Sequence, residues 1–216
     1  LRRYYRFISQ RTWKGHSCDL HWGALKIPSP AGPIHGRLYN AEGGHDKPLI
    51  VFFHGGGWVL GGLDSHHAFC LELAAKADCS VIAIDYRLAP EHTFPAAQDD
   101  CLAAVVWIAR NIGDFGPGNG KLVIAGDSAG GNLAAVTCLA MDETLRRQLS
   151  GAVLIYPAVD NPDAGHESYT VHAKSQPLTT DLMRWFWHTY LGKETNKATK
   201  AGAFPMQSSA LSQMPP

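Results

Sequence analysis

The chain has 216 residues, of which 45% are hydrophobic and 18% charged, and its 19 Lys and Arg residues balance 19 Asp and Glu residues. This balance excludes the strong basic field by which proteins bind nucleic acid or an anionic membrane surface. The length supports one large core, so we expect a single domain over residues 1–216. No apolar run approaches the ~18 residues of a membrane-spanning helix. Five cysteines without a C-x-x-C pair favour a reducing, cytoplasmic location.

The first predicted elements follow a basic and aromatic N-terminal segment. Residues 1–19 lack the apolar core of a signal peptide. Residues 20–27 and 34–39 are predicted to pair as a hairpin, because Pro28 and Gly32 are turn residues between two strand-like runs.

The apolar run 49–53 leads directly into His54-Gly55-Gly56-Gly57. The run shows no alternation, which is typical of a parallel strand covered by helices on both faces. Consecutive glycines let the backbone approach a bound carbonyl and direct amide N–H groups at it, as an oxyanion hole requires. We expect His54 and Gly55 to support this loop, with His54 bonded to backbone rather than acting as a base. Trp58 and Leu60, just beyond the loop, are candidate substrate-pocket residues.

The next segment is predicted to contain a helix, a strand, a loop and a second helix, at about 65–77, 80–84, 86–92 and 95–111. Pro95 suits the first turn of a helix. Within the loop we expect Arg87 to pair with Glu91. Asp85 precedes the serine discussed next, which is the wrong chain order for a triad acid of this kind.

The most informative segment is Gly126-Asp127-Ser128-Ala129-Gly130, between a predicted strand at 121–125 and a helix expected to run to about Leu149. This setting is typical of a nucleophile elbow, in which a sharp turn lifts a serine hydroxyl above a helix N-terminus. Such a turn requires glycine at positions 126 and 130, because a side chain at either position would collide with the neighbouring strand or helix. Trypsin-like proteases have a similar string, but no helix follows their serine. The pattern therefore predicts a serine hydrolase with Ser128 as its nucleophile.

A last predicted strand at about 151–156 is followed by a looser stretch and by a helix that begins near Thr179. This helix is apolar on more than one face. Trp185 and Phe186 are candidate walls of an acyl pocket, because such pockets are lined by apolar and aromatic groups. Ordinary packing against the core is the alternative for both.

Taken together, three motifs resemble the hormone-sensitive-lipase-like, or family IV, esterases of the α/β-hydrolase superfamily. They span residues 54–57, 85–97 and 126–131, in the order and spacing of that family. The resemblance implies an α/β-hydrolase fold, with a mostly parallel sheet flanked by helices. It also implies a helical cap, formed here by about residues 1–19 and 166–205.

The same resemblance implies carboxylic ester hydrolysis on short- to medium-chain acyl esters through an acyl-enzyme. Carried over to this sequence, Ser128 is the nucleophile, and the N–H groups of Gly56, Gly57 and Ala129 form the oxyanion hole. No motif indicates a metal ion or another cofactor. The expected partner is a small-molecule ester, with no nucleic acid and no stable membrane insertion.

The chain departs from the family downstream of the serine. Members place the triad acid in an Asp-Pro motif and the histidine after a later strand, and neither occurs before Pro216. We therefore expect the last two sheet strands to be missing, and the isolated chain to be inactive or nearly so, because a serine without its base is a weak nucleophile. Residues in the right chain order are available in the cap and loop stretch, where we expect them to be solvated: Asp160, Asp163 and Asp181 as acids, and His166, His172 and His188 as bases.

Missing strands would leave the strand near 151–156 as an apolar sheet edge, which is an aggregation hazard. We expect a homo-oligomer or a complementing C-terminal fragment to cover it. Two alternatives to an esterase stay open. One is a non-catalytic relative that binds a small molecule, as the plant gibberellin receptors do. The other is an amide or acylpeptide hydrolase on the same fold.

Overall fold

The computed structural model describes residues 2, 3, 5, 7, 9, 20–40, 47–115, 120–193 and 202–216. Most of the expected cap segment 1–19, and residues 194–201 of the second cap segment, lie outside this part of the chain. No helix within the described residues has the length and apolar character needed to cross a bilayer.

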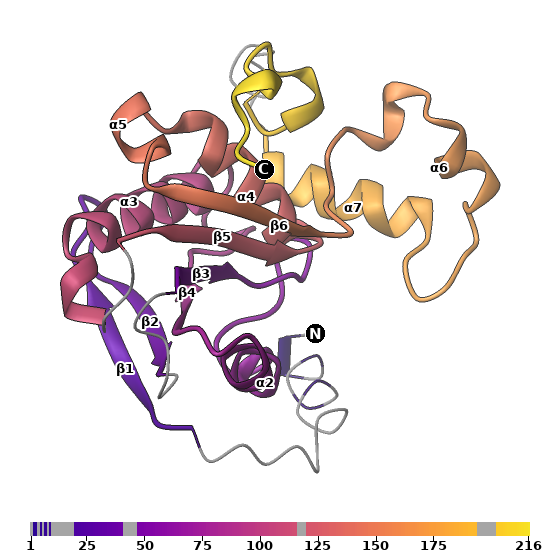
Figure 1. The fold of residues 1–216 in the computed structure, drawn as a ribbon. Coiled ribbons are helices and arrows are strands. Elements are labelled where there is room, and N and C mark those ends of the chain that lie inside the picture. Colours follow the sequence, from indigo (N-terminus) through magenta and orange to yellow (C-terminus); the bar gives the residue numbers. More distant parts are fainter. Residues whose placement is uncertain are drawn as a thin grey trace.

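The centre of the fold is a six-stranded sheet in the order β1-β2-β4-β3-β5-β6 (Figure 1). β1 pairs antiparallel with β2, and β2 pairs antiparallel with β4. The pairs β3–β4, β3–β5 and β5–β6 are all parallel. This confirms the predicted hairpin and the mostly parallel α/β sheet. The strands are β1 (Trp22–Ile27), β2 (Ile34–Tyr39), β3 (Leu49–Phe53), β4 (Val81–Asp85), β5 (Leu122–Asp127) and β6 (Leu149–Ile155).

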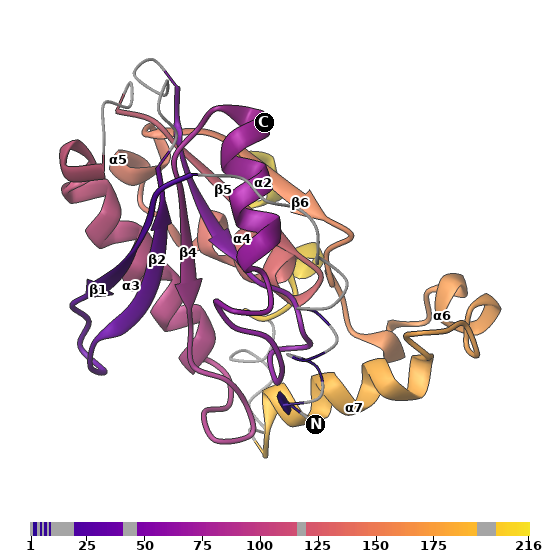
Figure 2. The ribbon, with the colours of Figure 1, turned by 90° about the horizontal axis from the view of Figure 1, so that it is seen from below.

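Helices cover both faces of the sheet, which explains why the central strands are apolar without alternation. α2 (His67–Ala77) packs on one face and α3 (Ala96–Arg110) and α4 (Ala129–Ala140) on the other, as Figures 1 and 2 show. All five residues of β3 are buried. Val51 and Phe53 belong to the core under α3 and α4, whereas Ile50 and Phe52 belong to the core under α2.

The elbow helix is shorter than the sequence predicted. α4 ends at Ala140, because Met141 has an extended backbone with φ −70° and ψ 143°. A separate short helix, α5 (Glu143–Arg146), then begins at Asp142, whose side chain accepts a hydrogen bond of 2.8 Å from the N–H of Leu145. The expected continuous helix to Leu149 is therefore wrong, since an Asp N-cap restarts the chain in a new direction.

The predicted Arg87–Glu91 pair is also wrong. The Arg87 guanidinium pairs with the buried carboxylate of Asp100 on α3, with Nη2 2.8 Å from Oδ1. Glu91 instead accepts hydrogen bonds from Arg2, with Arg2 Nη2 2.6 Å from Oε2. Arg87 ties its loop to α3 because the buried carboxylate needs a charged partner more than the exposed Glu91 does.

Beyond β6 the chain forms short helical pieces and one longer helix, and of these α6 and α7 lie past the carboxyl end of β5 and β6 (Figure 1). The longer helix, α7, starts at a Thr179 cap whose Oγ1 accepts a 3.2 Å hydrogen bond from the N–H of Leu182, as predicted for this region. In chain order the elements beyond β6 are η3 (Pro162–Ala164), α6 (Glu167–Val171), α7 (Thr180–Leu191), η4 (Pro205–Gln207) and η5 (Leu211–Gln213), whereas another short helix, η2 (Ile112–Phe115), lies between α3 and β5.

β6 lies at the edge of the sheet, as predicted. Among the described residues its strand partner is β5 alone. On the open side, the N–H of Ala152 donates a 2.8 Å hydrogen bond to the carbonyl of Pro216. Val153 is 50% exposed and Tyr156, just past the strand, is 73% exposed. The edge therefore presents apolar side chains, the feature that natural sheets usually protect.

Candidate active site

Ser128 occupies the corner between β5 and α4. Its backbone has φ 53° and ψ −116°, a conformation that non-glycine residues rarely adopt and that costs about 1–3 kcal/mol. The surroundings hold it there. The N–H of Ser128 donates to the carbonyl of Ile155 at 2.8 Å, and its carbonyl accepts from the N–H groups of Asn132 at 3.0 Å and Ala158 at 3.2 Å. Ser128 as a whole residue is partly exposed at this corner.

Two glycines make this corner possible. A Cβ built on Gly126 would lie 2.3 Å from the carbonyl oxygen of Gly130, and one built on Gly130 would lie 2.0 Å from the carbonyl oxygen of Phe53. Both distances are far inside van der Waals contact with backbone, which has little freedom to move. The collision expected from the sequence is therefore present, and α4 can approach β3 only because both positions lack a side chain.

The glycine-rich loop leaves the end of β3 beside the serine. β3 and β5 are neighbouring parallel strands, with Phe53 opposite Gly126, so their loops emerge at the same edge of the sheet. Gly56 and Gly57 have φ values of +123° and +61°. A Cβ on Gly56 would lie 2.4 Å from the carbonyl oxygen of Leu60. The loop thus curls back on itself and brings its backbone amides to the edge where Ser128 lies.

A carboxylate joins the two loops. The N–H of Gly55 donates to Asp127 Oδ1 at 2.7 Å, and His66 Nε2 lies 3.3 Å from the same oxygen. Burial alone would raise the pKa of the Asp127 carboxyl, but the hydrogen bond and charge of His66 and the N–H of Gly55 together hold that pKa below its usual value. Asp127 is therefore ionised at neutral pH. Neither side chain was predicted from the sequence: Asp127 lies inside the serine motif without an assigned role, and His66 belongs to no motif.

His54 is buried at the start of the glycine loop. It is 2% exposed, its Nδ1 lies 2.8 Å from the carbonyl oxygen of Gly55, and its ring stacks on Tyr86 with centroids 4.3 Å apart. The Tyr86 hydroxyl donates to the His54 carbonyl at 2.6 Å. Burial lowers the pKa of His54 to about 4, so the ring is neutral at physiological pH. Its contacts are with the loop backbone, which is the arrangement of a supporting residue.

Comparison with known proteins assigns the chain to a family. A family model described as alpha/beta hydrolase fold matches residues 50–216. The chain belongs to the α/β-hydrolase family. This confirms the resemblance to hormone-sensitive-lipase-like esterases noted from the motifs.

Individual relatives of this α/β-hydrolase are esterases by name. The carboxylic ester hydrolase LipN of Mycobacterium tuberculosis is 42% identical over 89% of this chain and 52% of its own length. The arylesterase of Saccharolobus solfataricus is 41% identical over 62% of this chain and 43% of its own. The solved esterase of Pyrobaculum calidifontis superposes with a TM-score of 0.88 at 37% identity, over 100% of this chain and 71% of that one. The chain spans about half the length of the curated relatives it matches.

The four candidate pocket residues of the α/β-hydrolase occupy two different environments. Trp58 and Leu60 are buried, at 1% and 7% exposure, and Trp58 stacks on Tyr190 with centroids 4.5 Å apart. Phe186 of α7 lies against the glycine loop, since a Cβ on Gly57 would come within 2.2 Å of its ring. Trp185 is 44% exposed and its ring lies 5.1 Å from that of Phe186. Of the two candidates on α7, Phe186 is therefore the one that lies against the glycine loop.

The structure pairs one acid and one base from the predicted alternatives. His166 Nε2 lies 2.8 Å from Asp160 Oδ2, and Asp160 also accepts a 2.8 Å hydrogen bond from Gln207. Asp163 and Asp181 instead pair with Arg184, and His172 and His188 are exposed. Within the described residues, no histidine is hydrogen-bonded to the Ser128 hydroxyl.

Proposed function

We propose that the protein is a carboxylic ester hydrolase in which Ser128 is the nucleophile. The observation that carries this proposal is the strained Ser128 backbone, with φ 53° at the N-terminus of α4, beside a glycine loop that starts from the adjacent strand. A protein keeps such a conformation where the chemistry needs it. The N–H groups of Gly56, Gly57 and Ala129 form the proposed oxyanion hole.

The geometry supports acyl transfer. Ser128 Oγ attacks the ester carbonyl, and the negative charge that develops on the carbonyl oxygen is stabilised by the oxyanion amides and by the positive end of the α4 dipole. A general base takes the Ser128 proton and passes it to the departing alkoxide, so that the acyl–oxygen bond of the ester breaks and the alcohol leaves. The acyl-enzyme that remains on Ser128 is then hydrolysed by water. The helix dipole is effective here because α4 begins at the very next residue, Ala129.

We propose Phe186 and Trp185 as the wall of the substrate pocket and α6 and α7 as part of the cap. Support comes from the contact of Phe186 with Gly57, which places an aromatic ring against the amides that would hold the ester carbonyl. A ring so close to the reacting centre limits the acyl group to short or medium length. The relatives named as esterases are consistent with this substrate class.

The test is hydrolysis of p-nitrophenyl acetate, butyrate, octanoate and palmitate by the purified protein and by Ser128→Ala. We expect this chain to hydrolyse esters only slowly, because no histidine within the described residues is bonded to the Ser128 hydroxyl, and we expect Ser128→Ala to abolish that hydrolysis. Ser150→Ala is the matched control, because Ser150 is exposed on β6, and it should leave hydrolysis unchanged. A fluorophosphonate should label the peptide that contains Ser128.

Hydrolysis that survives in Ser128→Ala would refute the proposal. Saturable ester binding with neither turnover nor fluorophosphonate labelling of Ser128 would favour a small-molecule-binding relative. Turnover of anilides faster than of the matched esters would favour an amide hydrolase.

A further inference from the structure

The Asp127 carboxylate lies between the two loops of the proposed site. Asp127 directly precedes Ser128 in the chain, and the N–H that it accepts at 2.7 Å belongs to Gly55, which directly precedes Gly56. The carboxylate of the residue before the nucleophile therefore binds the residue before the proposed oxyanion amides. The side chain is only 13% exposed, so water competes little for this hydrogen bond.

The fit between the carboxylate and the loop is tight. A Cβ built on Gly55 would lie 2.2 Å from Asp127 Oδ2 and 2.9 Å from its Cγ. The carboxylate thus occupies the space that any side chain at position 55 would need. A displacement of Asp127 would leave this space empty and free the loop to shift.

His66 holds the carboxylate from the other side. Its side chain is 14% exposed, its Nε2 lies 3.3 Å from Asp127 Oδ1, and its Nδ1 lies 2.9 Å from Ser65 Oγ. Ser65 is buried and its hydroxyl donates to the carbonyl of Gly62 at 2.9 Å. The contacts therefore run without a break from the segment before α2, through His66 and Asp127, to the N–H of Gly55.

We propose that Asp127 and His66 are positioning residues, which fix the oxyanion loop in register with Ser128 so that the Gly56 and Gly57 amides meet the developing charge. The inference rests on the proposed esterase function. Neither side chain touches the substrate in this arrangement. Their effect falls on the transition state, because oxyanion donors contribute most when the charge develops.

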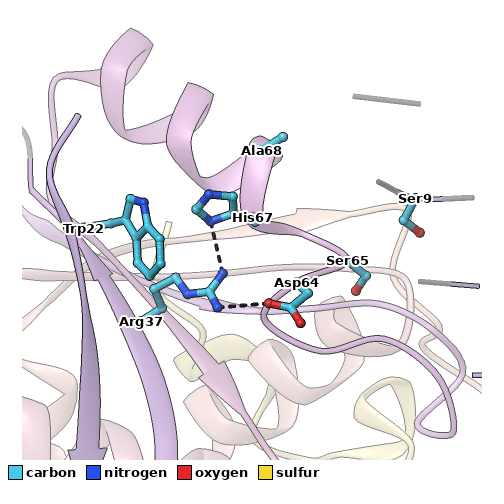
Figure 3. Close-up of a pocket in the computed structure, with 7 residues that line it drawn as sticks. All are labelled: Ser9, Trp22, Arg37, Asp64, Ser65, His67 and Ala68. Atoms are coloured by element: carbon cyan, nitrogen blue, oxygen red, sulfur yellow. Dashed lines mark hydrogen bonds and ion pairs between the residues drawn. The ribbon is translucent and has the colours of Figure 1, made fainter. Parts of the chain in front are cut away.

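The neighbouring histidine provides a matched control. His67 points away from the elbow and into a different cluster, where its Nδ1 lies 3.1 Å from Arg37 Nη1 and 3.0 Å from the Tyr39 hydroxyl. Figure 3 shows its ring beside Trp22, with a dashed line that joins it to Arg37. His66 and His67 are thus adjacent in sequence but only His66 reaches Asp127.

The experiment compares Asp127→Asn, His66→Ala, His66→Gln, His67→Gln and Ser128→Ala by steady-state kinetics on p-nitrophenyl butyrate. We expect Asp127→Asn to lower kcat by about 10- to 100-fold with KM within about twofold of wild type. His66→Ala should lower kcat in the same way but less. His66→Gln should restore most of it, because its amide N–H can replace Nε2–H. His67→Gln should keep the wild-type kcat.

A second readout is independent of turnover. In a ¹⁵N–¹H spectrum the Gly55 amide proton should resonate downfield because it is bonded to a carboxylate, and should move upfield in Asp127→Asn. An unchanged Gly55 resonance would overturn the proposal, as would a kcat within about twofold of wild type for Asp127→Asn. Equal losses in His66→Ala and His67→Gln would overturn it too.

If Asp127→Asn does not fold, the comparison of His66→Ala with His66→Gln decides. Wild-type turnover and fluorophosphonate labelling no greater than those of Ser128→Ala would refute the esterase function instead, and the Gly55 resonance would still decide on the contact.

Discussion

Replacement of His54 by asparagine offers a quantitative test of how the glycine loop is held. The Nδ2 of asparagine can occupy the place of His54 Nδ1, which lies 2.8 Å from the carbonyl oxygen of Gly55. The His54→Asn variant therefore keeps a donor to the loop, while removing the only group at this position that titrates. Loss of the stacking on Tyr86 should lower the overall stability of the variant by a constant amount at every pH.

The magnitude follows from the pKa of His54. Burial lowers this pKa from 6.5 to about 4 in the folded protein. Below about pH 6.5 the unfolded chain therefore binds a proton that the folded chain refuses, and protonation favours unfolding. The free energy of unfolding should be highest above this pH and should fall by about 3 kcal/mol as the pH decreases to about 4.

The assay is urea denaturation of both proteins at several pH values between about 7 and about 4. His67 also has a pKa lowered by burial and by Arg37, and its smaller contribution has the same sign in both proteins. The difference in unfolding free energy between wild type and His54→Asn should therefore shrink by about 3 kcal/mol over this range. A difference that stays constant with pH would refute the reasoning, because His54 would then titrate normally in the folded protein.

Two further predictions concern packing at the site. Gly130→Ala should lower the free energy of unfolding by at least about 2 kcal/mol in urea denaturation, because its Cβ would lie 2.0 Å from the carbonyl oxygen of Phe53. Gly113→Ala, where nothing lies within 4 Å, is the control, and equal losses in the two variants would contradict the steric explanation. Trp187→Ala should cost about 3–5 kcal/mol, because this side chain is 1% exposed. Trp185→Ala should lower the free energy of unfolding by less than about 1 kcal/mol, because Trp185 is 44% exposed. A thermal-shift comparison in which Trp185→Ala is the less stable of the two variants would contradict the packing of α7.

The sequence was sufficient for the part of the site that depends on neighbouring parallel strands. The apolar runs of β3 and β5 predicted buried strands, and the glycine motifs at their ends predicted two loops at one edge of the sheet. The pairing of Phe53 with Gly126 places the ends of β3 and β5 side by side, so the two loops leave the sheet together. Such local patterns are readable because a loop motif and the strand before it are continuous in the chain.

Partners that are chosen by packing could not be read in this way. Arg87 has Glu91 close by in sequence, yet it pairs with Asp100, because α3 buries that carboxylate against the loop. His66 and His67 cannot be told apart from the sequence. The way the start of α2 packs against the serine turn determines that His66, and not His67, contacts Asp127. The end of α4 did have a local signal, since Asp142 is a good N-cap, but the apolar pattern runs on past it and conceals the break.

The backbone of Ser128 has a consequence for any effort to make this protein more robust. Its φ of 53° and ψ of −116° suit a residue without a Cβ, so replacement by glycine would relieve strain at the corner. A selection scheme that rewards heat resistance alone would favour this replacement and would discard the hydroxyl. Thermal stability and catalytic activity therefore favour different residues at position 128, and a screen on this scaffold needs to measure both.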